Sequence, residues 1–538
     1  MNRVGIVVVF ISSIAAVCCW MACGQHEQNS STPIAADTIP SRTVRKDISV
    51  TGSFSPQTKL HLDSSSLPLF FSKYPLFKPL QKDIQEFYST RKYAYAWYDT
   101  HGMIEQADNL YNHILHISEE GLPDKNLYKD QLDNIFGESS PERNPENELM
   151  LTAQYFDYVK KVWGGLSEKQ TRSMNWFLPR KELDLNFLMD SLLRDTSSSL
   201  IKKGYSFRQY ALLKSFLKKY RDIETKNKWK AIRSDRKAYK LGDSSVTLQA
   251  IRERLILLGD MNSDPRNSVF DEELEQGVKN YQHRFGVKED GVIGPQFLNE
   301  INQPLDKYIR QIIVNMERCR WIPVRLEGDY LIVNIPAFVL SAYDNDSLVF
   351  NMKVVVGKSL HKTVIFNGDL KYIVFSPYWN VPASIMKKEI IPALQKDPNY
   401  LKKNNMEWNG KSIRQKPGPN NALGLVKFLF PNNHDIYLHD SPAKNLFNED
   451  IRAFSHGCIR VAEPKKLAAY LLRKDPQWTD ARIVKAMNSG KEQYVTLKDP
   501  VPVFIAYLTS WVDKTGKLNL RKDIYQRDNR LEDMLMKN

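Results

Sequence analysis

One cysteine of the sequence stands among groups that could activate it. Residues 455–460 read Ser-His-Gly-Cys-Ile-Arg, so Cys458 has a histidine, a glycine and an arginine as near neighbours. A cysteine nucleophile needs thiolate character, which a nearby histidine and a positive field supply. A glycine beside it lets backbone N–H groups approach a developing oxyanion closely. A lone cysteine is more often a buried small hydrophobe. The neighbouring histidine, glycine and arginine are what make Cys458 a candidate nucleophile.

A second histidine upstream could act as the base for this cysteine. His439 ends the run Ile436-Tyr-Leu-His. In a strand alternate side chains share a face, so Tyr437 and His439 would point the same way while their neighbours enter the core. Asp440 follows directly and could orient the imidazole through its side chain or its backbone carbonyl. An aromatic wall and a base would then line one side of a cleft.

The elements that must position these residues read mainly as strands. Short β-branched runs separated by turn residues predict strands at 330–335, 352–356, 372–375, 435–439, 503–507 and 517–520. Residues 383–422 interrupt this pattern with Lys-, Asn- and Pro-rich sequence. We interpret that interruption as a helix-and-loop insertion that could cover a cleft as a lid.

Two helical regions precede the strands. In 242–302 three helices are predicted: one after Ser244 or Ser245 that ends at Gly259, one from Asp271 to Gly286, and one opened by Pro295. The longer region before it is rich in aromatic residues and repeats apolar residues at three- and four-residue steps. Its clearest series is Leu149, Thr152, Tyr155, Val159 and Val162. This pattern predicts a helical scaffold packed by aromatic rings.

Length and composition set the frame. A chain of 538 residues predicts several domains, and 42% hydrophobic with 26% charged residues excludes a wholly disordered protein. The net charge of +14 suits an anionic partner such as nucleic acid, a membrane or a cell-wall polymer, without choosing among them. The five cysteines exclude a dense disulfide framework.

The N-terminus predicts the compartment. An apolar run from Val4 to Ala22 follows Arg3 and precedes Cys23-Gly, as in an export signal. Ala22-Cys23-Gly24 is similar to a bacterial lipoprotein processing site, at which Cys23 would be lipidated; an uncleaved anchor is the alternative. Either interpretation predicts that the rest of the chain lies outside the cytoplasm.

The motifs together resemble the large L,D-transpeptidases, penicillin-insensitive enzymes that cross-link peptidoglycan. The resemblance rests on His439 with Ser455-His-Gly-Cys458, and it extends to several other segments. These are Asn315–Arg318, Arg320–Pro323, Val333–Pro336, Pro377–Pro382, Pro417–Gly424, Pro500–Val503 and Asp523–Tyr525. Val246-x-Leu-Gln, Val278-x-x-Tyr-Gln and Asp290-Gly-x-x-Gly-Pro are also similar to the three-helix peptidoglycan-binding module of wall enzymes.

This resemblance implies a multidomain α+β chain: a helical scaffold, a three-helix peptidoglycan-binding-like module and a mainly β L,D-transpeptidase catalytic domain with an inserted lid. The expected boundaries, in chain order, are an export or lipoprotein signal at 1–23, a tether at 24–66, the scaffold at 67–240, the wall-binding-like module at 241–303, the catalytic domain at 308–526 with its lid at 383–422, and a polar tail at 527–538.

The resemblance also assigns roles. Cys458 would be the nucleophile, His439 the general base, and N–H groups around Gly457 and Cys458 the oxyanion hole. Supporting roles would fall to Ser455, His456, Arg460 and Asp440, and the walls of the substrate cleft to Tyr437 and Trp379. Cys458 would attack a stem tetrapeptide, release D-alanine and pass the acyl group to a neighbouring stem as a 3→3 cross-link.

The implied partners are donor and acceptor stem tetrapeptides, the cell-wall polymer and a membrane reached through the N-terminal anchor, in the periplasm or cell envelope. No cofactor, metal or nucleic acid is implied. The resemblance further implies that carbapenems acylate Cys458.

Other functions stay open at this stage. Water in place of the acceptor amine would make the same site a carboxypeptidase, and a non-catalytic wall-binding scaffold lipoprotein or a cysteine peptidase are further alternatives. A zinc set of His434, His439, His456 and Cys458 has admissible ligand types but fits no common spacing. A disulfide between Cys319 and Cys458 would silence the enzyme.

Overall fold

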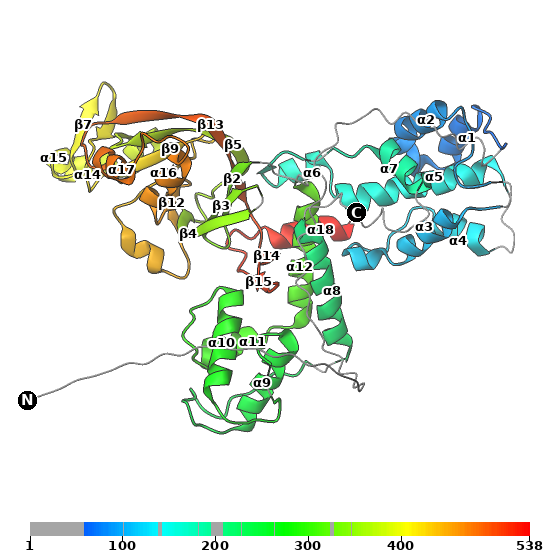
Figure 1. The fold of residues 1–538 in the computed structure, drawn as a ribbon, viewed down its shortest axis with the longest axis horizontal. Helices are drawn as coiled ribbons and strands as arrows, with labels where there is room; N and C mark the ends of the chain where they lie inside the picture. The colour runs from blue at the N-terminus through cyan, green and yellow to red at the C-terminus, as the bar shows by residue number, and fades with distance from the viewer. Residues whose placement is uncertain are drawn as a thin grey trace, which may run out of the picture. The chain divides into compact units, whose positions relative to one another are not determined.

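The computed structural model describes residues 59–99, 102–137, 143–180, 182–194, 208–226, 229–262, 264–322, 328–345 and 347–537 (Figure 1). The predicted export signal with Cys23, and most of the predicted tether, lie outside the described residues. Within the described ranges, no helix combines the length and the apolar character needed to cross a membrane.

The first region is helical, as its periodicity predicts. Its elements are α1 (Ser66–Lys73), η1 (Pro75–Leu80), α2 (Gln81–Thr90), α3 (Glu105–Leu115), η2 (Ile117–Glu120), α4 (Lys129–Gly137), α5 (Pro145–Val159), η3 (Lys160–Gly164), α6 (Glu168–Ser173), β1 (Trp176–Phe177), α7 (Leu185–Arg194) and α8 (Arg208–Lys226). Helix α5 is buried on nearly every side, because α1, α3, α4 and α7 all contact it. Aromatic rings fill this core, including the edge-to-face pair of Trp97 and Tyr155. Packing already begins at Leu62, which is buried, a few residues before the expected end of the tether.

The second region holds the three predicted helices: α9 (Val246–Leu258), α10 (Glu272–Phe285) and α11 (Pro295–Ile301). The predicted caps are confirmed. Ser245 and Asp271 accept backbone N–H groups at the starts of α9 and α10, while Gly259 and Gly286 end them in the left-handed conformation. Pro295 opens α11. Val246, the first residue of α9, does not contribute to the core of this region, because its side chain is exposed.

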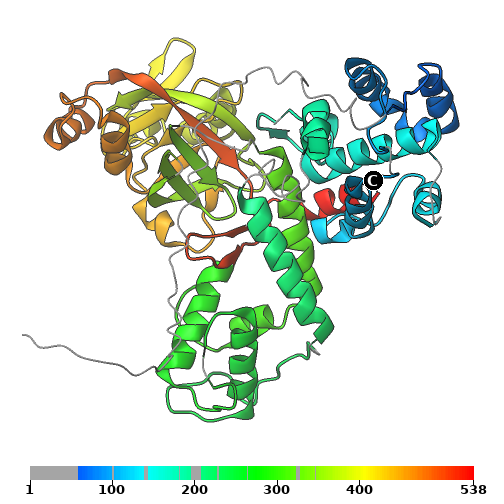
Figure 2. The same ribbon diagram turned by 45° about the vertical axis from the view of Figure 1, so that its right-hand side comes forward.

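Long helix α12 (Leu305–Trp321) leads into the strand-rich region. It lies beside α8 in both ribbon views, and the two helices are in contact (Figures 1 and 2). The strands that follow are β2 (Asp329–Asn334), β3 (Val339–Asp344), β4 (Ser347–Gly357), β5 (Ile365–Phe375), β9 (Val426–Leu429), β10 (Leu438–His439), β11 (Ala453–Ser455), β12 (Ile459–Val461), β13 (Gln493–Ala506), β14 (Ser510–Val512) and β15 (Leu518–Leu520). Helices α16 (Pro464–Leu472) and α17 (Asp480–Met487), with the short turn η5 (Lys444–Asn448), lie between them.

The main sheet closes on itself. Its strand order is β5-β13-β2-β3-β4-β12-β10-β9, and β9 pairs with β5 as well as with β10. Strand β13 joins distant parts of the chain, since it runs parallel to β2 with Val503 beside Leu331. The helical region also contributes to this sheet, because β1 pairs in parallel with β5. The architecture is therefore multidomain α+β, as the sequence predicts.

The insertion at 383–422 folds around a small core of its own. Its helical elements are α13 (Ala383–Ile385), η4 (Met386–Ile390), α14 (Ile391–Lys396) and α15 (Tyr400–Lys403). Its strands β7 (Met406–Asn409) and β8 (Ser412–Gln415) form a small sheet with β6 (Trp379–Asn380), in the order β6-β8-β7. Val381, Ile390 and Ile413 form that core. The predicted lid is thus a mixed helix-and-strand unit.

The end of the chain differs from expectation. Residues 527–538 were expected to be only a polar tail, yet Asp528–Lys537 form helix α18. Leu531 and Leu535 are buried, and α18 contacts α12. Although the segment is mostly polar, Leu531 and Leu535 are four residues apart, so a helix places both on the same face.

A buried ion pair on α12 ties the helical region to the strand-rich region. Arg320 donates to the Glu317 carboxylate at 2.7 Å and to the carbonyls of Val162 at 2.8 Å and Glu120 at 2.6 Å. The other oxygen of Glu317 accepts from the Leu166 N–H at 2.6 Å. Both side chains of the pair are fully buried. Every charge is therefore satisfied, as burial away from water requires.

Replacing Arg320 by alanine should strongly destabilise the fold. The Glu317 carboxylate would stay buried without its charge partner, which typically costs about 3–5 kcal/mol. Urea denaturation followed by circular dichroism measures the loss. The matched control is Arg172→Ala, which breaks a solvent-exposed pair with Glu168 on α6 and should cost less than about 1 kcal/mol. Equal destabilisation by the two substitutions would contradict this account.

Candidate active site

Two short parallel strands bring the predicted reactive residues together. In β10 and β12, Leu438 lies beside Ile459 and His439 beside Arg460. Neighbouring side chains of a ladder point to the same face, and alternate residues share that face. One face of this strand pair therefore carries four of the predicted residues: Tyr437, His439, Cys458 and Arg460. Their separation along the chain does not reveal this proximity. The predicted alternation is confirmed at Tyr437 and His439, whose rings lie 5.7 Å apart.

Cys458 sits at this face with its side chain half-buried. Its thiol contacts the carbonyl oxygen of Asp435 at 3.5 Å and the hydroxyl of Tyr437. Burial raises the pKa of the Cys458 thiol above its usual value, against the lowering effect of Tyr437 and Arg460. Burial thus opposes the thiolate character that the neighbouring histidine and arginine were expected to supply to Cys458.

His439 is buried and held by the backbone. Its Nδ1 lies 2.5 Å from the carbonyl oxygen of Asp440. Burial and the charge of Arg460 lower the pKa of His439 to about 3. The imidazole is consequently neutral near pH 7, and the backbone of Leu423 lies beside the ring as well as that of Asp440. A proton on Nδ1 would be donated to the Asp440 carbonyl and would leave Nε2 without one.

Of the two groups of Asp440, the backbone carbonyl rather than the carboxylate is the one that contacts His439. The carboxylate instead accepts from the N–H groups of Leu425 at 2.9 Å and Ser441 at 2.7 Å, and from Lys444 at 2.5 Å. Gly424 is required beside it: φ is +63°, and a Cβ there would lie 2.4 Å from the carboxyl group. Asp440 thus fixes the loop that precedes β9.

The backbone N–H groups of the Ser-His-Gly-Cys turn differ in whether they have a hydrogen-bond acceptor. The N–H of Gly457 donates to Ser455 Oγ at 3.1 Å, and that hydroxyl donates to the carbonyl of Cys458 at 2.5 Å. No acceptor is found among the described residues for the N–H of Cys458. Of the two amides expected at an oxyanion hole, only that of Cys458 is available.

His456 contacts the insertion at 383–422, the predicted lid. Its Nε2 lies 3.0 Å from the Glu389 carboxylate in η4, and its ring lies 5.0 Å from that of His361. Arg460 remains on the strand face, where burial lowers its pKa. Its Nε atom is buried and has no hydrogen-bond partner among the described residues.

Several predicted residues lie elsewhere. Trp379 belongs to the lid sheet, where it pairs with Gln415 and packs against the lid core. His434 packs between Phe177 and Phe366. Cys319 is buried in α12 and is not joined to Cys458. In the ranges that the structure describes, no group of three or more His, Cys, Asp or Glu side chains could hold a metal ion.

Sequence reasoning missed two residues that touch the motif. Glu389 reaches His456 from the lid, and the hydroxyl of Thr363 donates to the carbonyl of Gly457 at 2.9 Å. Neither lies in a motif or an alternating pattern, and both contacts join segments far apart in the chain.

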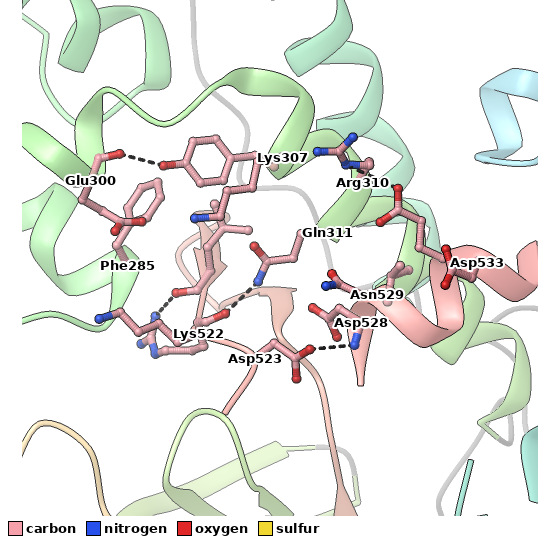
Figure 3. Close-up of a pocket in the computed structure, with 15 residues that line it drawn as sticks. Phe285, Glu300, Lys307, Arg310, Gln311, Lys522, Asp523, Asp528, Asn529 and Asp533 are labelled. Atoms are coloured by element: carbon pink, nitrogen blue, oxygen red, sulfur yellow. Dashed lines mark hydrogen bonds and ion pairs between the residues drawn. The ribbon is translucent and has the colours of Figure 1, made fainter. Parts of the chain in front are cut away.

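A cavity of about 550 Å³ lies away from these residues (Figure 3). It is lined by α12, α18 and the segment after β15, with Phe285 and Glu300 at one end. Its polar groups bind one another: Gln311 donates to the Arg521 carbonyl, Arg310 pairs with Glu532, and Asp523 accepts the Asp528 N–H. These mutual bonds point to a structural role.

The pH dependence of thiol alkylation should report the neutral resting state. Because only the thiolate reacts, the rate of iodoacetamide addition to Cys458 should rise about tenfold per pH unit up to pH 9. The raised pKa of Cys458 places the plateau above that pH. Mass spectrometry of the Cys458 peptide follows the rate and separates it from Cys319. A plateau reached between pH 6 and 7.5 would instead demonstrate a preformed thiolate–imidazolium pair.

Three domain families match parts of the chain. The L,D-transpeptidase catalytic domain matches residues 328–503, a "Scaffold domain" matches 82–217, and a "Putative peptidoglycan binding domain" matches 244–301. A curated Haemophilus influenzae protein, "Putative L,D-transpeptidase", is 32% identical over 243 residues. The match covers 41% of this chain and 49% of that protein, so the chain spans about half the length of this relative.

Solved structures of L,D-transpeptidases are similar at low identity. The protein from Stackebrandtia nassauensis is 13% identical over 51% of this chain and 97% of its own, with a TM-score of 0.23. The one from Xylanimonas cellulosilytica is 14% identical over 51% of this chain and 100% of its own, with a TM-score of 0.18. From these matches, residues 328–503 are similar to L,D-transpeptidase catalytic domains, residues 82–217 to a scaffold domain and residues 244–301 to a peptidoglycan-binding domain.

Proposed function

We propose that this protein forms 3→3 cross-links in peptidoglycan through a thioester on Cys458. The observation that carries the proposal is the single strand face shared by Tyr437, His439, Cys458 and Arg460. The family of the catalytic domain supports the same chemistry.

In the first acyl transfer, the Cys458 sulfur attacks the carbonyl carbon between the diamino acid and D-alanine of a stem tetrapeptide. As the carbon–sulfur bond forms, the thiol proton moves to Nε2 of His439. The imidazolium then donates that proton to the amine of D-alanine as the carbon–nitrogen bond breaks. Free D-alanine leaves, and a thioester remains.

In the second transfer, the side-chain amine of a neighbouring stem attacks the thioester carbonyl. His439 takes a proton from the amine and returns it to the departing sulfur, which regenerates the thiol. Water in place of the amine would give a tripeptide, and the site would then act as a carboxypeptidase. A lid that excludes water favours transfer to the amine.

The remaining residues take supporting roles. The N–H of Cys458 is the proposed oxyanion donor, because the Gly457 N–H is engaged by Ser455. Asp440 orients the base through its carbonyl. Arg460 adds positive charge beside the sulfur and opposes protonation of His439. Tyr437 is the proposed cleft wall.

Other parts of the chain have proposed roles of a different kind. His456 joins the motif to the lid through Glu389, and Trp379 supports the substrate cleft through that lid. The chemistry written above needs no metal or organic cofactor. The boundaries given above for the signal, tether, domains and lid stay proposals.

The cellular setting is part of the proposal. Donor and acceptor stem tetrapeptides and the wall polymer are the partners, and nucleic acid is not. The peptidoglycan-binding domain at 244–301 supports a location in the cell envelope. Tethering to a membrane through Cys23 or through an uncleaved N-terminal anchor stays a prediction, as do the cleaved signal and the periplasmic location.

Loss of the thiol should abolish product. The full chain, purified in mild detergent and kept reduced, is incubated with disaccharide-tetrapeptide and its products are read by mass spectrometry. We expect a cross-linked dimer that has lost one D-alanine, and none from Cys458→Ala, because no thioester can form. The matched control is Cys319→Ala, which removes the other thiol of the folded domains and should keep the activity.

The other outcomes of that assay are equally informative. Tripeptide without dimer would identify a carboxypeptidase. Retained turnover by folded Cys458→Ala would overturn the proposed nucleophile. Absence of any product, together with binding to isolated cell wall that survives Cys458→Ala, would identify a wall-binding scaffold.

Opening the contact between the lid and the motif should shift the balance between the two products. Glu389→Ala removes the carboxylate that meets His456 at 3.0 Å, so water should reach the thioester more easily. We expect the ratio of tripeptide to dimer to rise at least about twofold. The control is Glu407→Ala, which removes a lid carboxylate paired with Arg414 and Lys416. An unchanged ratio in Glu389→Ala would show that this contact does not exclude water.

A further inference from the structure

The carbonyl of Gly457 and the amide of Cys458 belong to one peptide group, and a buried threonine holds that group. Thr363 is fully buried. Its hydroxyl donates to the Gly457 carbonyl at 2.9 Å and accepts from the Gly357 N–H at 2.9 Å. Both functions of the hydroxyl are therefore used, and its orientation is fixed from two sides.

Fixing the carbonyl also fixes the amide. A peptide group is planar, and in its trans form the C=O and N–H bonds point in opposite directions. The bond to Thr363 therefore directs the N–H of Cys458 away from the buried threonine. This is the amide for which no acceptor is found among the described residues, and it is the donor proposed for the oxyanion.

Ser455 holds the two flanking peptide groups, through the Gly457 N–H and the Cys458 carbonyl, but it does not bond to this one. Gly457 has φ +120°, a conformation that L side chains rarely adopt, and the nearest atom to a Cβ built there is the His361 carbonyl oxygen at 4.0 Å. Glycine brings wide conformational freedom at such a position. The hydroxyl of Thr363 supplies the restraint that sterics do not.

The segment that carries Thr363 is itself anchored. It approaches the end of β4 so closely that a Cβ on Gly357 would lie 2.0 Å from the His361 carbonyl oxygen. The hydroxyl of Tyr525 donates to the Gly357 carbonyl at 2.5 Å and accepts from the Thr363 N–H at 3.3 Å. The threonine thus has a rigid base, fastened by a segment far downstream in the chain.

We propose that Thr363 is a positioning residue that aims the Cys458 amide at the oxyanion of the acyl-transfer steps. The proposal rests on the proposed function, in which Cys458 is acylated. It goes further by naming a residue outside the motif on which the oxyanion hole depends. Removing a single oxyanion donor typically lowers a rate about 10²–10³-fold, so misdirecting one should cost somewhat less.

Two reactions of the same sulfur separate this role from a general one. Acylation by a carbapenem passes through a tetrahedral oxyanion, whereas alkylation by iodoacetamide displaces iodide and forms none. In the full chain at one pH, Thr363→Val should lower the acylation rate about 10–100-fold. Its alkylation rate should stay within about twofold of the wild type, because the thiol and His439 are unchanged. Thr363→Ser keeps the hydroxyl and should restore acylation to within about threefold.

A matched variant controls for loosening of the domain. Thr509 is also fully buried and shares its hydroxyl between Asn315 and Asp528, away from Gly457. Thr509→Val should leave the ratio of acylation to alkylation within about twofold of the wild type. Mass spectrometry of the Cys458 peptide measures both reactions.

Each contrary result has one meaning. Unchanged acylation of Thr363→Val would overturn the positioning role, as would an equal fall of acylation and alkylation, or an equal change of their ratio in Thr509→Val. Wild-type protein that is alkylated at Cys458 but never acylated by a carbapenem or a tetrapeptide would overturn the proposed function instead.

Discussion

The buried pair of Glu317 and Arg320 is the constraint on which the arrangement around α12 depends. Two opposite charges inside a protein are tolerated only when every polar atom around them is satisfied. Here the bonds come from the carbonyls of Glu120 and Val162 and the N–H of Leu166, all in the helical region. One helix that leads into the catalytic sheet therefore dictates where three backbone segments of another region must lie.

The same helix uses a second set of polar residues toward its other side. Asn315 donates to the Thr509 hydroxyl at 2.7 Å and accepts the Thr509 N–H at 2.9 Å. Arg318 pairs with Asp528 at the start of α18. Different residues of α12 thus bind different parts of the chain. Glu317 and Arg320 contact the preceding helical region, whereas Asn315 and Arg318 contact segments near the end of the chain.

At the proposed active site, burial raises the pKa of the Cys458 thiol and lowers that of the His439 imidazole, so burial favours the neutral form of both groups. The proton must then move as the sulfur attacks, and charge appears only during reaction. Such a site gains from dipoles that are already oriented, since they need no reorganisation at that moment. In the proposed mechanism the backbone provides these dipoles: the Asp440 carbonyl for His439, and the Cys458 amide for the oxyanion.

What the sequence predicted well was local. Caps such as Ser245 and Gly259, the alternation of Tyr437 and His439, and the grouping around Cys458 all follow from neighbours within a few residues. What it did not predict depends on distant pairing. Thr363, Glu389 and β1 matter through contacts with segments far away, and a single sequence carries no signal for those. Two leucines in α18 are too few to distinguish a packed helix from a polar tail by sequence alone. Trp379 was predicted at the substrate cleft because of its residue type, whereas in the structure it packs against the lid core.

The anchoring of Gly357 and Thr363 by Tyr525 has a consequence for biosynthesis. A ribosome makes Cys458 well before it makes Tyr525, and β13 must also find β2 across a long stretch of chain. Contacts of such sequence separation form late, because closing a long loop costs entropy before the contact repays it. A nascent chain would therefore carry its cysteine for some time without a finished oxyanion site. On the proposed role of Thr363, full reactivity of Cys458 toward carbonyl substrates would arise only after the segment with Tyr525 has docked.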